Sequence, residues 1–370
     1  MNSEKSKIEE EFFQLIRYAL GVSDDYSRLT EEEWERIDKY CCEQGLLPWM
    51  YAGIERMPQE GKPHQELMLQ WYVDTLGMQQ HSRNATKCVL RLTQQIEQDG
   101  LKTCVLKGVG CSMLYPEPDK RIAGDIDIWI IPQTGSSNDI ISYVKQRFPN
   151  VTDAIYHHVV IADYKGQTIE VHFRPSFMTN PLHNYRLQQW FASQAEAQSS
   201  HRTELPGGKG TIACPTTDFN MVYLMSHIAK HIVQDSVTLK SILDYYYLLR
   251  QRGRNCDNSE ALRLMRRFGL MPYTRAVMYI LHDTFGMESD YLIAPPDARK
   301  GAFLLKEIMR GTDFGQPENA PRWMKESWVG RSLLRLGHDI RVARHFPSEC
   351  LWEPAFRLWH FVWKKAQSSK

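Results

Sequence analysis

One apolar run that contains two acids constrains the fold more than any other segment of this chain. Residues 124–130 read Gly-Asp-Ile-Asp-Ile-Trp-Ile, and the two acids are Asp125 and Asp127. A spacing of two residues places both carboxylates on one face of a β-strand, and the apolar neighbours indicate that the strand, over 125–131, is buried. Two adjacent carboxylates repel each other unless a cation lies between them. The run therefore predicts a metal site, although a solvent-facing strand edge also alternates polar and apolar residues.

A glycine-containing turn precedes the acidic strand. Residues 103–106 form a short apolar strand, and Lys107, Gly108, Gly110 and Ser112 follow it. Glycine lets the backbone approach a phosphate closely, and amide groups at the start of the next helix can donate to it. The segment is not a Walker A loop, because no Gly-Lys-Ser/Thr follows at the required spacing. It predicts either a phosphate-binding turn, with Lys107 as a point charge, or an ordinary strand-to-helix turn.

A third acid lies in a predicted hairpin. Residues 155–164 and 168–173 are extended in character, with a Lys-Gly turn between them. Glu170 and His172 share one face of the second strand. If that strand lies beside 125–131, Glu170 completes a three-carboxylate cluster that could bind metal and act as general base. The alternative is an amphipathic strand with its polar face in water, and His172 could contact substrate or be structural.

Helices are predicted on both sides of this α/β segment. Residues 30–33 form a capping box, residues 65–97 continue the helical pattern, and residues 218–250 are strongly periodic. Segments around 286–297 and 311–321 are predicted as loops. We therefore expect an α+β fold, a small mixed β-sheet core flanked by N- and C-terminal helical regions. The expected ranges are 1–98 for the N-terminal helices, 99–178 for the core, 179–290 for helices that complete a cleft, and 291–370 for a C-terminal helical region.

Composition excludes some classes of protein. The 370 residues are 42% hydrophobic and carry a net charge of +1, so a polyanion would have to meet a local basic patch. The polar N-terminus does not resemble a signal peptide, and no apolar run approaches the ~20 residues that span a bilayer. The eight cysteines are scattered without a CxxC pair, which indicates reduced thiols. These features predict a cytoplasmic protein without a transmembrane segment.

Three further groups of residues have two interpretations each. Arg121, just before the acids, could clamp a phosphate or be a surface arginine. His227 and His231 have the spacing of a zinc-binding HxxxH, but no HExxH glutamate and no third ligand accompany them. Nucleotide contact or core packing is therefore favoured, with Lys230 reaching a phosphate. The basic and aromatic segment 331–370 could bind nucleic acid or a membrane surface, but a helix packed on the body is preferred.

Taken together, these motifs resemble a bacterial family of uncharacterised nucleotidyltransferases in the polymerase-beta-like nucleotidyltransferase superfamily. The residues that carry the resemblance are Leu106-Lys107-Gly108, Leu114-Tyr115-Pro116, Arg121, Gly124-Asp125-Ile126-Asp127, Glu170-Val171-His172, His227 to His231 and Leu243-Asp244. The match runs from about residue 30 to 250. It departs from the superfamily in its phosphate turn and in having Glu rather than Asp as the third acid.

The resemblance implies a mixed-sheet catalytic core that binds Mg²⁺ (or Mn²⁺) and a nucleoside triphosphate. It implies that Asp125, Asp127 and Glu170 are the metal ligands and catalytic acids. Lys107, Gly108, Gly110, Ser112, Arg121, His172, Lys230 and His231 are the expected nucleotide-binding residues. The hydroxyl acceptor stays open between a small molecule, a protein and a tRNA. The alternatives are a nucleotide-binding scaffold without turnover, and an RNA- or membrane-associated protein that acts through its C-terminal segment.

Overall fold

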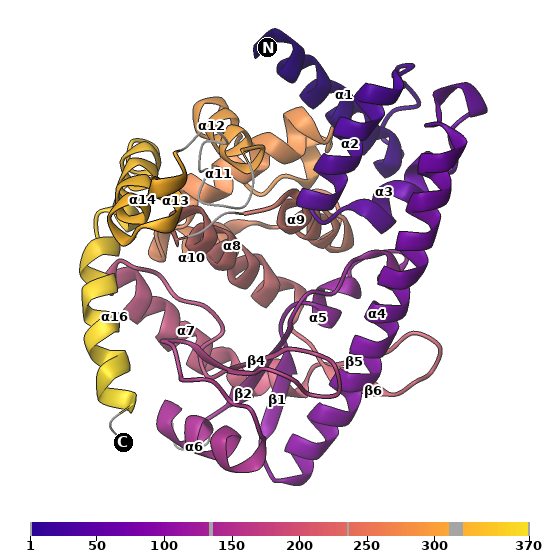
Figure 1. Cartoon of the computed structure of the whole chain (residues 1–370). Helices are drawn as coiled ribbons and strands as arrows, with labels where there is room; N and C mark the ends of the chain where they lie inside the picture. Colours follow the sequence, from indigo (N-terminus) through magenta and orange to yellow (C-terminus); the bar gives the residue numbers. More distant parts are fainter. Residues whose placement is uncertain (1, 133–135, 235–236, 311–320, 369–370) are drawn as a thin grey trace.

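The computed structural model describes residues 2–132, 136–234, 237–310 and 321–368. A small mixed sheet lies between helical regions, so the expected α+β class is confirmed (Figure 1). The loop expected over 286–297 is present, with one short 3-10 turn, η4 (Ser289–Tyr291). Most of the second expected loop, residues 311–320, lies outside the described residues.

Four strands form the main sheet in the order β1-β2-β4-β3. The strands are β1 (Lys102–Val105), β2 (Ile126–Ile131), β3 (His158–Ile161) and β4 (Ile169–His172). β1 runs antiparallel to β2, β2 runs parallel to β4, and β4 pairs antiparallel with β3. The predicted hairpin is confirmed, and β4 lies beside β2, the condition under which Glu170 joins the other acids. A separate two-stranded sheet, β5 (Arg202–Glu204) with β6 (Thr211–Ala213), was not expected.

The two faces of the sheet have different partners because side chains alternate along each strand. Ile126, Ile128 and Ile130 enter a core shared with α4 (Gln65–Gln98) and α6 (Ser137–Arg147). Asp127 and Trp129 point to the opposite face, where Trp129 stacks on Phe219 of α8 (Thr217–Gln234) with ring centroids 6.0 Å apart. Asp127 and Trp129 therefore face the later helices, while Ile126, Ile128 and Ile130 face α4 and α6.

Two of the N-terminal helices, α2 (Glu31–Glu43) and α4 (Gln65–Gln98), begin where the sequence predicts. Thr30 and Glu33 form the predicted capping box, in which each side chain pairs with the other residue's backbone amide. The last helix of this region, α4, extends along one edge of the molecule to the sheet (Figure 1). The elements up to the hairpin are α1 (Asn2–Leu20), α2 (Glu31–Glu43), α3 (Leu47–Ile54), η1 (Gln59–Gly61), α4 (Gln65–Gln98), α5 (Val109–Ser112), η2 (Pro118–Lys120) and α6 (Ser137–Arg147).

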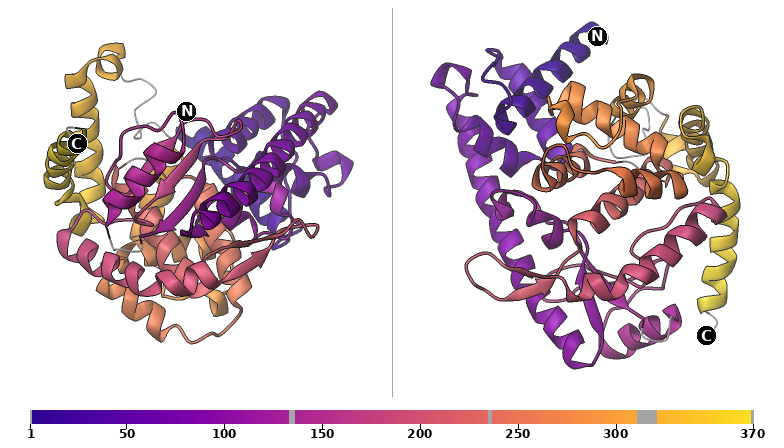
Figure 2. Two further views of the ribbon diagram at one scale, coloured as in Figure 1. Left: turned by 90° about the horizontal axis from the view of Figure 1, so that it is seen from below. Right: turned by 180° about the vertical axis from the view of Figure 1, so that it is seen from behind.

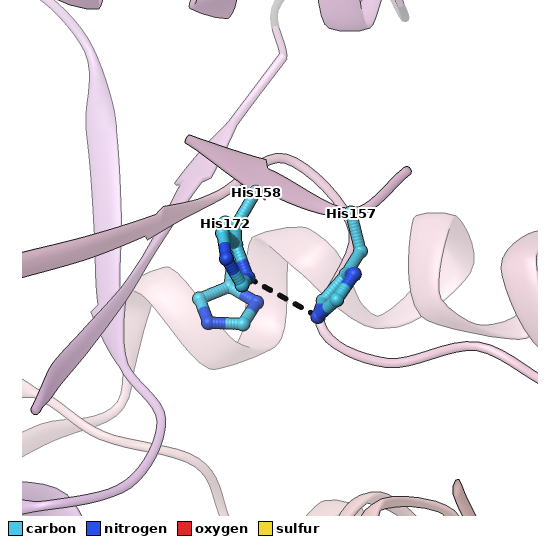
Figure 3. Close-up of side chains that lie close together, drawn as sticks. All are labelled: His157, His158 and His172. Carbon is cyan, nitrogen blue, oxygen red and sulfur yellow. Dashed lines mark hydrogen bonds between the residues drawn. The ribbon is translucent and has the colours of Figure 1, made fainter. Parts of the chain in front are cut away.

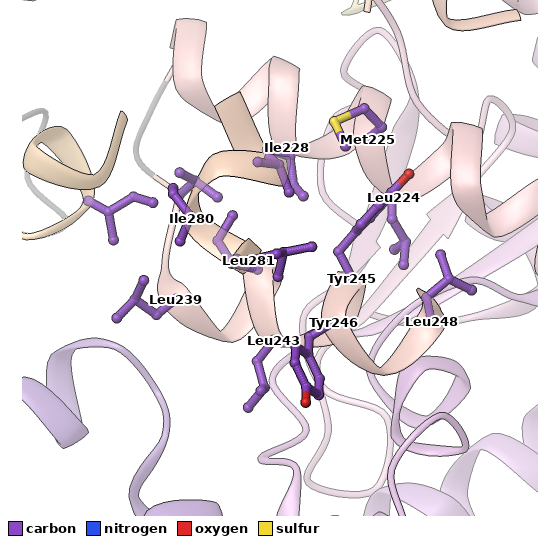
Figure 4. Close-up of a cluster of buried hydrophobic side chains, with 14 of the residues drawn as sticks. Leu224, Met225, Ile228, Leu239, Leu243, Tyr245, Tyr246, Leu248, Ile280 and Leu281 are labelled. Atoms are coloured by element: carbon purple, nitrogen blue, oxygen red, sulfur yellow. The ribbon is translucent and has the colours of Figure 1, made fainter. Parts of the chain in front are cut away.

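The later helices are built around the periodic segment predicted at 218–250. That segment forms α8 and α9, whose apolar residues pack with the π-helical turn η3 (Figure 4). The elements after the hairpin are α7 (Pro181–Ser200), α8 (Thr217–Gln234), α9 (Leu239–Arg252), α10 (Ser259–Arg267), α11 (Met271–Tyr279), η3 (Ile280–Thr284), α12 (Ala298–Ile308), α13 (Arg322–Glu326), α14 (Trp328–Ala343), α15 (Pro347–Cys350) and α16 (Glu353–Ser368). One hydrophobic core contains residues from α1 to α15. The division of the chain into four regions, which the sequence analysis expects, stays a prediction.

The C-terminal helix α16 lies at the outer edge of the molecule (Figure 2). Its Phe356 stacks on Phe177 with ring centroids 5.0 Å apart, and Trp359 contacts the ring of Tyr156. These contacts agree with the preferred interpretation of the C-terminal segment, a helix packed on the body of the protein. Leu358 and Phe361 on the same helix are exposed. No helix in the described part of the chain is long and apolar enough to cross a membrane.

A buried ion pair joins α9 to the loop before β2. Arg121 donates through Nε and Nη2 to the two carboxylate oxygens of Asp244, each at 2.7 Å, and both side chains are about 5% exposed. Asp244 also accepts from the hydroxyl of Tyr115 at 2.8 Å. Arg121 Nη1 donates to the carbonyl of Gly108 at 3.0 Å. One side chain therefore ties the helical region to the glycine turn of the sheet.

The substitution Asp244→Asn should lower the free energy of unfolding by about 3–5 kcal/mol, because it leaves the Arg121 charge buried without a counter-ion. Denaturant titration measures the change. The matched control is Asp119→Asn, which removes the half-exposed partner of Arg83 and should cost less than about 1 kcal/mol. Equal losses in the two variants would contradict a structural role for the buried pair.

Candidate active site

Asp127 is the buried acid of the site, with 3% of the residue exposed. Its Oδ1 lies 3.0 Å from His172 Nε2 and 3.6 Å from Lys107 Nζ. Burial alone would raise the pKa of this carboxyl, but Lys107 and His172 outweigh burial and hold the pKa well below its usual range. Asp127 is therefore an ionised carboxylate inside the protein.

Glu170 lies beside Asp127 because the two residues are register partners on adjacent parallel strands. Its Oε2 is 3.3 Å from His172 Nε2 and 3.3 Å from His158 Nδ1. Burial would raise the pKa of Glu170, but the hydrogen bond from His172 and the charges of His172 and His158 together lower the pKa below its usual value. Two ionised acids therefore share this face of the sheet.

His172 lies between the two acids and is 2% exposed. Its Nδ1 lies 3.3 Å from the carbonyl oxygen of Arg174, and its Nε2 faces both carboxylates. Every one of these partners is an acceptor, so both ring nitrogens carry protons. Burial would lower the pKa of His172, but Asp127 and Glu170 raise it above the usual value. The imidazolium is a positive charge held between two negative ones.

Asp125 lies just before β2 and is more exposed than Asp127. Burial is the main cause of the raised pKa of Asp125, and the negative charges of Glu170 and Asp127 raise this pKa further. Among the described residues, Asp127, Glu170 and His172 form a group of three possible metal ligands whose atoms lie within 4.8 Å of one another, and Asp125 does not belong to it. The three predicted acids therefore share one region, with Asp127 and Glu170 together and Asp125 at its rim.

Lys107 connects the glycine turn to the acids and to α8. Its Nζ donates to Nε2 of His227 at 2.9 Å and lies beside Asp127. Burial, then the charge of Lys107, keeps the pKa of His227 well below its usual value, so the ring is a neutral acceptor. The rings of His227 and His231 are 4.3 Å apart, and within the described residues no group of three ligands includes them. The contact with Lys107 accounts for His227, and His231 packs against the His227 ring.

The glycines of the turn are required by close backbone approaches. Gly108 has a φ of +59°, and a Cβ there would lie 2.7 Å from the carbonyl oxygen of Asp125. A Cβ on Gly110 would lie 2.5 Å from the carbonyl oxygen of Val105. The turn is thereby fitted tightly against the first acid of the site.

Two predicted phosphate contacts are used inside the protein. The hydroxyl of Ser112 donates to the carbonyl of Val109 at 2.7 Å, and the guanidinium of Arg121 is paired with Asp244. Both residues line a cavity of about 310 Å³ between α4 and the loop before β2, and none of the three acids lines it. Arg121 is therefore buried and not a surface arginine, and its contacts favour a positioning role over a phosphate clamp.

Sequence reasoning missed three residues of this region. His157 and His158 precede or begin β3, and His158 is the register partner of His172. Counting back from the Lys-Gly turn of the hairpin would have found that pairing. The Nζ of Lys230 lies 3.3 Å from Nε2 of His157. The third is Lys240 at the start of α9, whose pKa is lowered to about 8 by burial and then by the charge of Arg121. No local motif marks Lys240.

A small mixed sheet with acids on adjacent strands is the core expected of a nucleotidyltransferase. The family model described as uncharacterised nucleotidyltransferase matches residues 30–286, and the chain belongs to this family. No curated protein matches the chain. A solved structure described as an antigenic nucleotidyltransferase-like protein from Paracoccidioides brasiliensis aligns with 12% identity and a TM-score of 0.32, over 52% of this chain and 89% of that one.

The lowered pKa of Lys240 gives a signed dependence of stability on pH. Between pH 8 and about 10.4 the unfolded chain holds the Lys240 proton and the folded chain does not, so stability rises with pH in that window. Lys240→Met removes the buried charge and should raise the free energy of unfolding at pH 7 by about 1–3 kcal/mol. The gain should disappear as the pH rises from 8 to about 10.4.

Denaturant titrations of wild type and variant across that range measure the difference. Lys102→Met is the matched control, because Lys102 is half-exposed and pairs with an exposed carboxylate, Glu196. A gain for Lys240→Met that stays constant up to pH 10.5 would show that packing, and not the buried charge, is responsible.

Proposed function

We propose that this protein transfers a nucleoside monophosphate from a nucleoside triphosphate to a hydroxyl acceptor in the presence of Mg²⁺ (or Mn²⁺). The observation that supports this most is the pairing of Asp127 with Glu170 across two parallel strands, with Asp125 at the rim. Membership of a nucleotidyltransferase family supports the reaction class. The geometry supports the choice of residues.

The acids fit a hard divalent cation. Asp127 and Glu170 are held ionised, and the raised pKa of Asp125 reflects in part the repulsion among the three acids. The charge that now balances them is the His172 imidazolium, which a metal ion could replace. Carboxylate oxygen is the ligand that Mg²⁺ prefers. Asp125, Asp127 and Glu170 would hold the ion, which when bound supplies positive charge to the triphosphate and to the pyrophosphate leaving group.

Positive and amide groups around the acids would hold the triphosphate. Lys107 places its ammonium beside Asp127, and the backbone at Gly108 approaches Asp125 closely. Lys230 and His231 are proposed to contact the nucleotide from α8, and Lys240 is a further candidate from α9. Gly110, Ser112, Arg121 and His172 make their contacts within the protein, so we assign them to positioning the turn and the acids.

Glu170 is the proposed general base. Its carboxylate is ionised and less buried than that of Asp127, with side-chain exposures of 25% and 5%. The acceptor hydroxyl would lose its proton to Glu170 as its oxygen attacks the α-phosphorus, and the bond to the β-phosphate oxygen breaks to release pyrophosphate. The acceptor stays open between a small molecule, a protein and a tRNA. The net charge of +1 offers no general attraction to a long polyanion.

The test is to incubate the protein with Mg²⁺, a cell extract and each NTP labelled at the α-phosphate. A labelled acceptor should form with α-labelled but not with γ-labelled NTP, which separates nucleotidyl transfer from phosphoryl transfer. Asp127→Asn and Glu170→Gln should each lower the rate by about 10²–10⁴-fold, because each removes a charge at the reacting phosphate or the base.

Asp153→Asn, an exposed acid in the loop before β3, is the matched control and should keep the wild-type rate. Equal labelling by wild type and Asp127→Asn would overturn the assignment. Binding of NTP without any labelled product would instead identify a scaffold without turnover.

A further inference from the structure

Three histidines are buried together at the edge of the acidic site. His157, His158 and His172 are 4%, 8% and 2% exposed, and they come from the two paired strands of the hairpin and the residue before them (Figure 3). Each can offer a ring nitrogen such that the three nitrogens lie within 4.8 Å of one another. Three imidazoles that converge in the interior are a donor set with more nitrogen than Mg²⁺ uses.

The spacing of the three ring nitrogens is close to that of a coordination sphere. His157 Nε2 lies 3.1 Å from His158 Nδ1, and the nitrogens that the three rings offer all lie within 4.8 Å of one another. Ligands at about 2.1 Å in a tetrahedron are about 3.4 Å from one another. A contraction of the cluster would therefore bring the three nitrogens around one ion.

The hydrogen bonds of His172 are compatible with a metal ligand. Its Nε2 carries a proton toward Asp127 and Glu170, and a bound ion would take the place of that proton. His172 Nδ1 donates to the Arg174 carbonyl, the second contact that metal-bound histidines usually make.

We propose that His157, His158 and His172 form a binding site for Zn²⁺. Imidazole nitrogen suits Zn²⁺, and three histidines with a fourth position open are a known donor set for this ion. Glu170 contacts His158 and His172 and stays with the acids proposed to hold Mg²⁺. The zinc site is argued from its own geometry and does not depend on nucleotidyl transfer.

The positive charge of Lys230 lies beside the proposed zinc site and would repel a bound cation. The Lys230 ammonium lies 3.3 Å from His157 Nε2 and also contacts the ring of Phe177. A bound cation would have to displace that ammonium from His157. Replacing Lys230 with an uncharged residue of similar length should therefore strengthen metal binding, which a loss of folding cannot imitate.

The experiment is a titration of the full, EDTA-treated chain with Co²⁺, followed by competition with Zn²⁺. Wild type should give the visible absorption of tetrahedral Co²⁺ without a thiolate charge-transfer band, since no cysteine is proposed as a ligand. His157→Ala and His158→Ala should each weaken binding at least about tenfold, and Lys230→Met should tighten it by a similar factor. Thermal unfolding of each metal-free variant checks that it is folded.

Two controls separate this site from other metal-binding residues. His282→Ala removes a histidine that bonds the Met287 carbonyl elsewhere in the fold, and Asp153→Asn removes an exposed acid in the loop before β3. Both should bind Co²⁺ as wild type does. Unchanged affinity in folded His157→Ala and His158→Ala, or no tightening by Lys230→Met, would overturn the proposal. If a variant loses transferase activity but binds Co²⁺ as wild type does, the result concerns the proposed function and not the zinc site.

Discussion

The ion pair between Arg121 and Asp244 is the interaction on which the arrangement of the site depends. It is buried, and its two halves come from parts of the chain that are 123 residues apart. Through the Gly108 carbonyl it also holds the turn that meets Asp125. A buried charge pair of this kind is costly to break, so it fixes the distance between α9 and the sheet. The position of Lys240, four residues before Asp244 on α9, follows from the same contact.

On the face of the sheet toward α8, Asp127 and Glu170 each lie beside basic side chains. Lys107 and His172 neutralise Asp127, and His172 and His158 approach Glu170. The same arrangement supports both proposals, because a pair of ionised carboxylates suits a hard cation while imidazole nitrogen suits Zn²⁺. Glu170 lies at the junction of the two donor sets. A change at Glu170 is therefore expected to affect both.

Much of the framework followed from local patterns. The alternation around Asp125 and Asp127 identified β2, the Lys-Gly turn identified the hairpin, and the periodicity of 218–250 identified α8 and α9. Long-range contacts were harder. Arg121 was expected at a phosphate, but nothing near it in sequence shows that Asp244 would reach its guanidinium. Lys240 has no motif, and its lowered pKa arises from burial and from Arg121.

The sequence by itself determined the α+β class, the acidic strand, the third acid and the family resemblance, because strand alternation and helical periodicity are local properties. The tertiary structure decided which side chains those elements bring together. Parallel pairing of β2 with β4 joined Asp127 to Glu170, and the hairpin register joined His158 to His172. It also left Asp125 at the rim and turned Arg121 inward. Such contacts depend on how distant elements pack, and no local pattern records them.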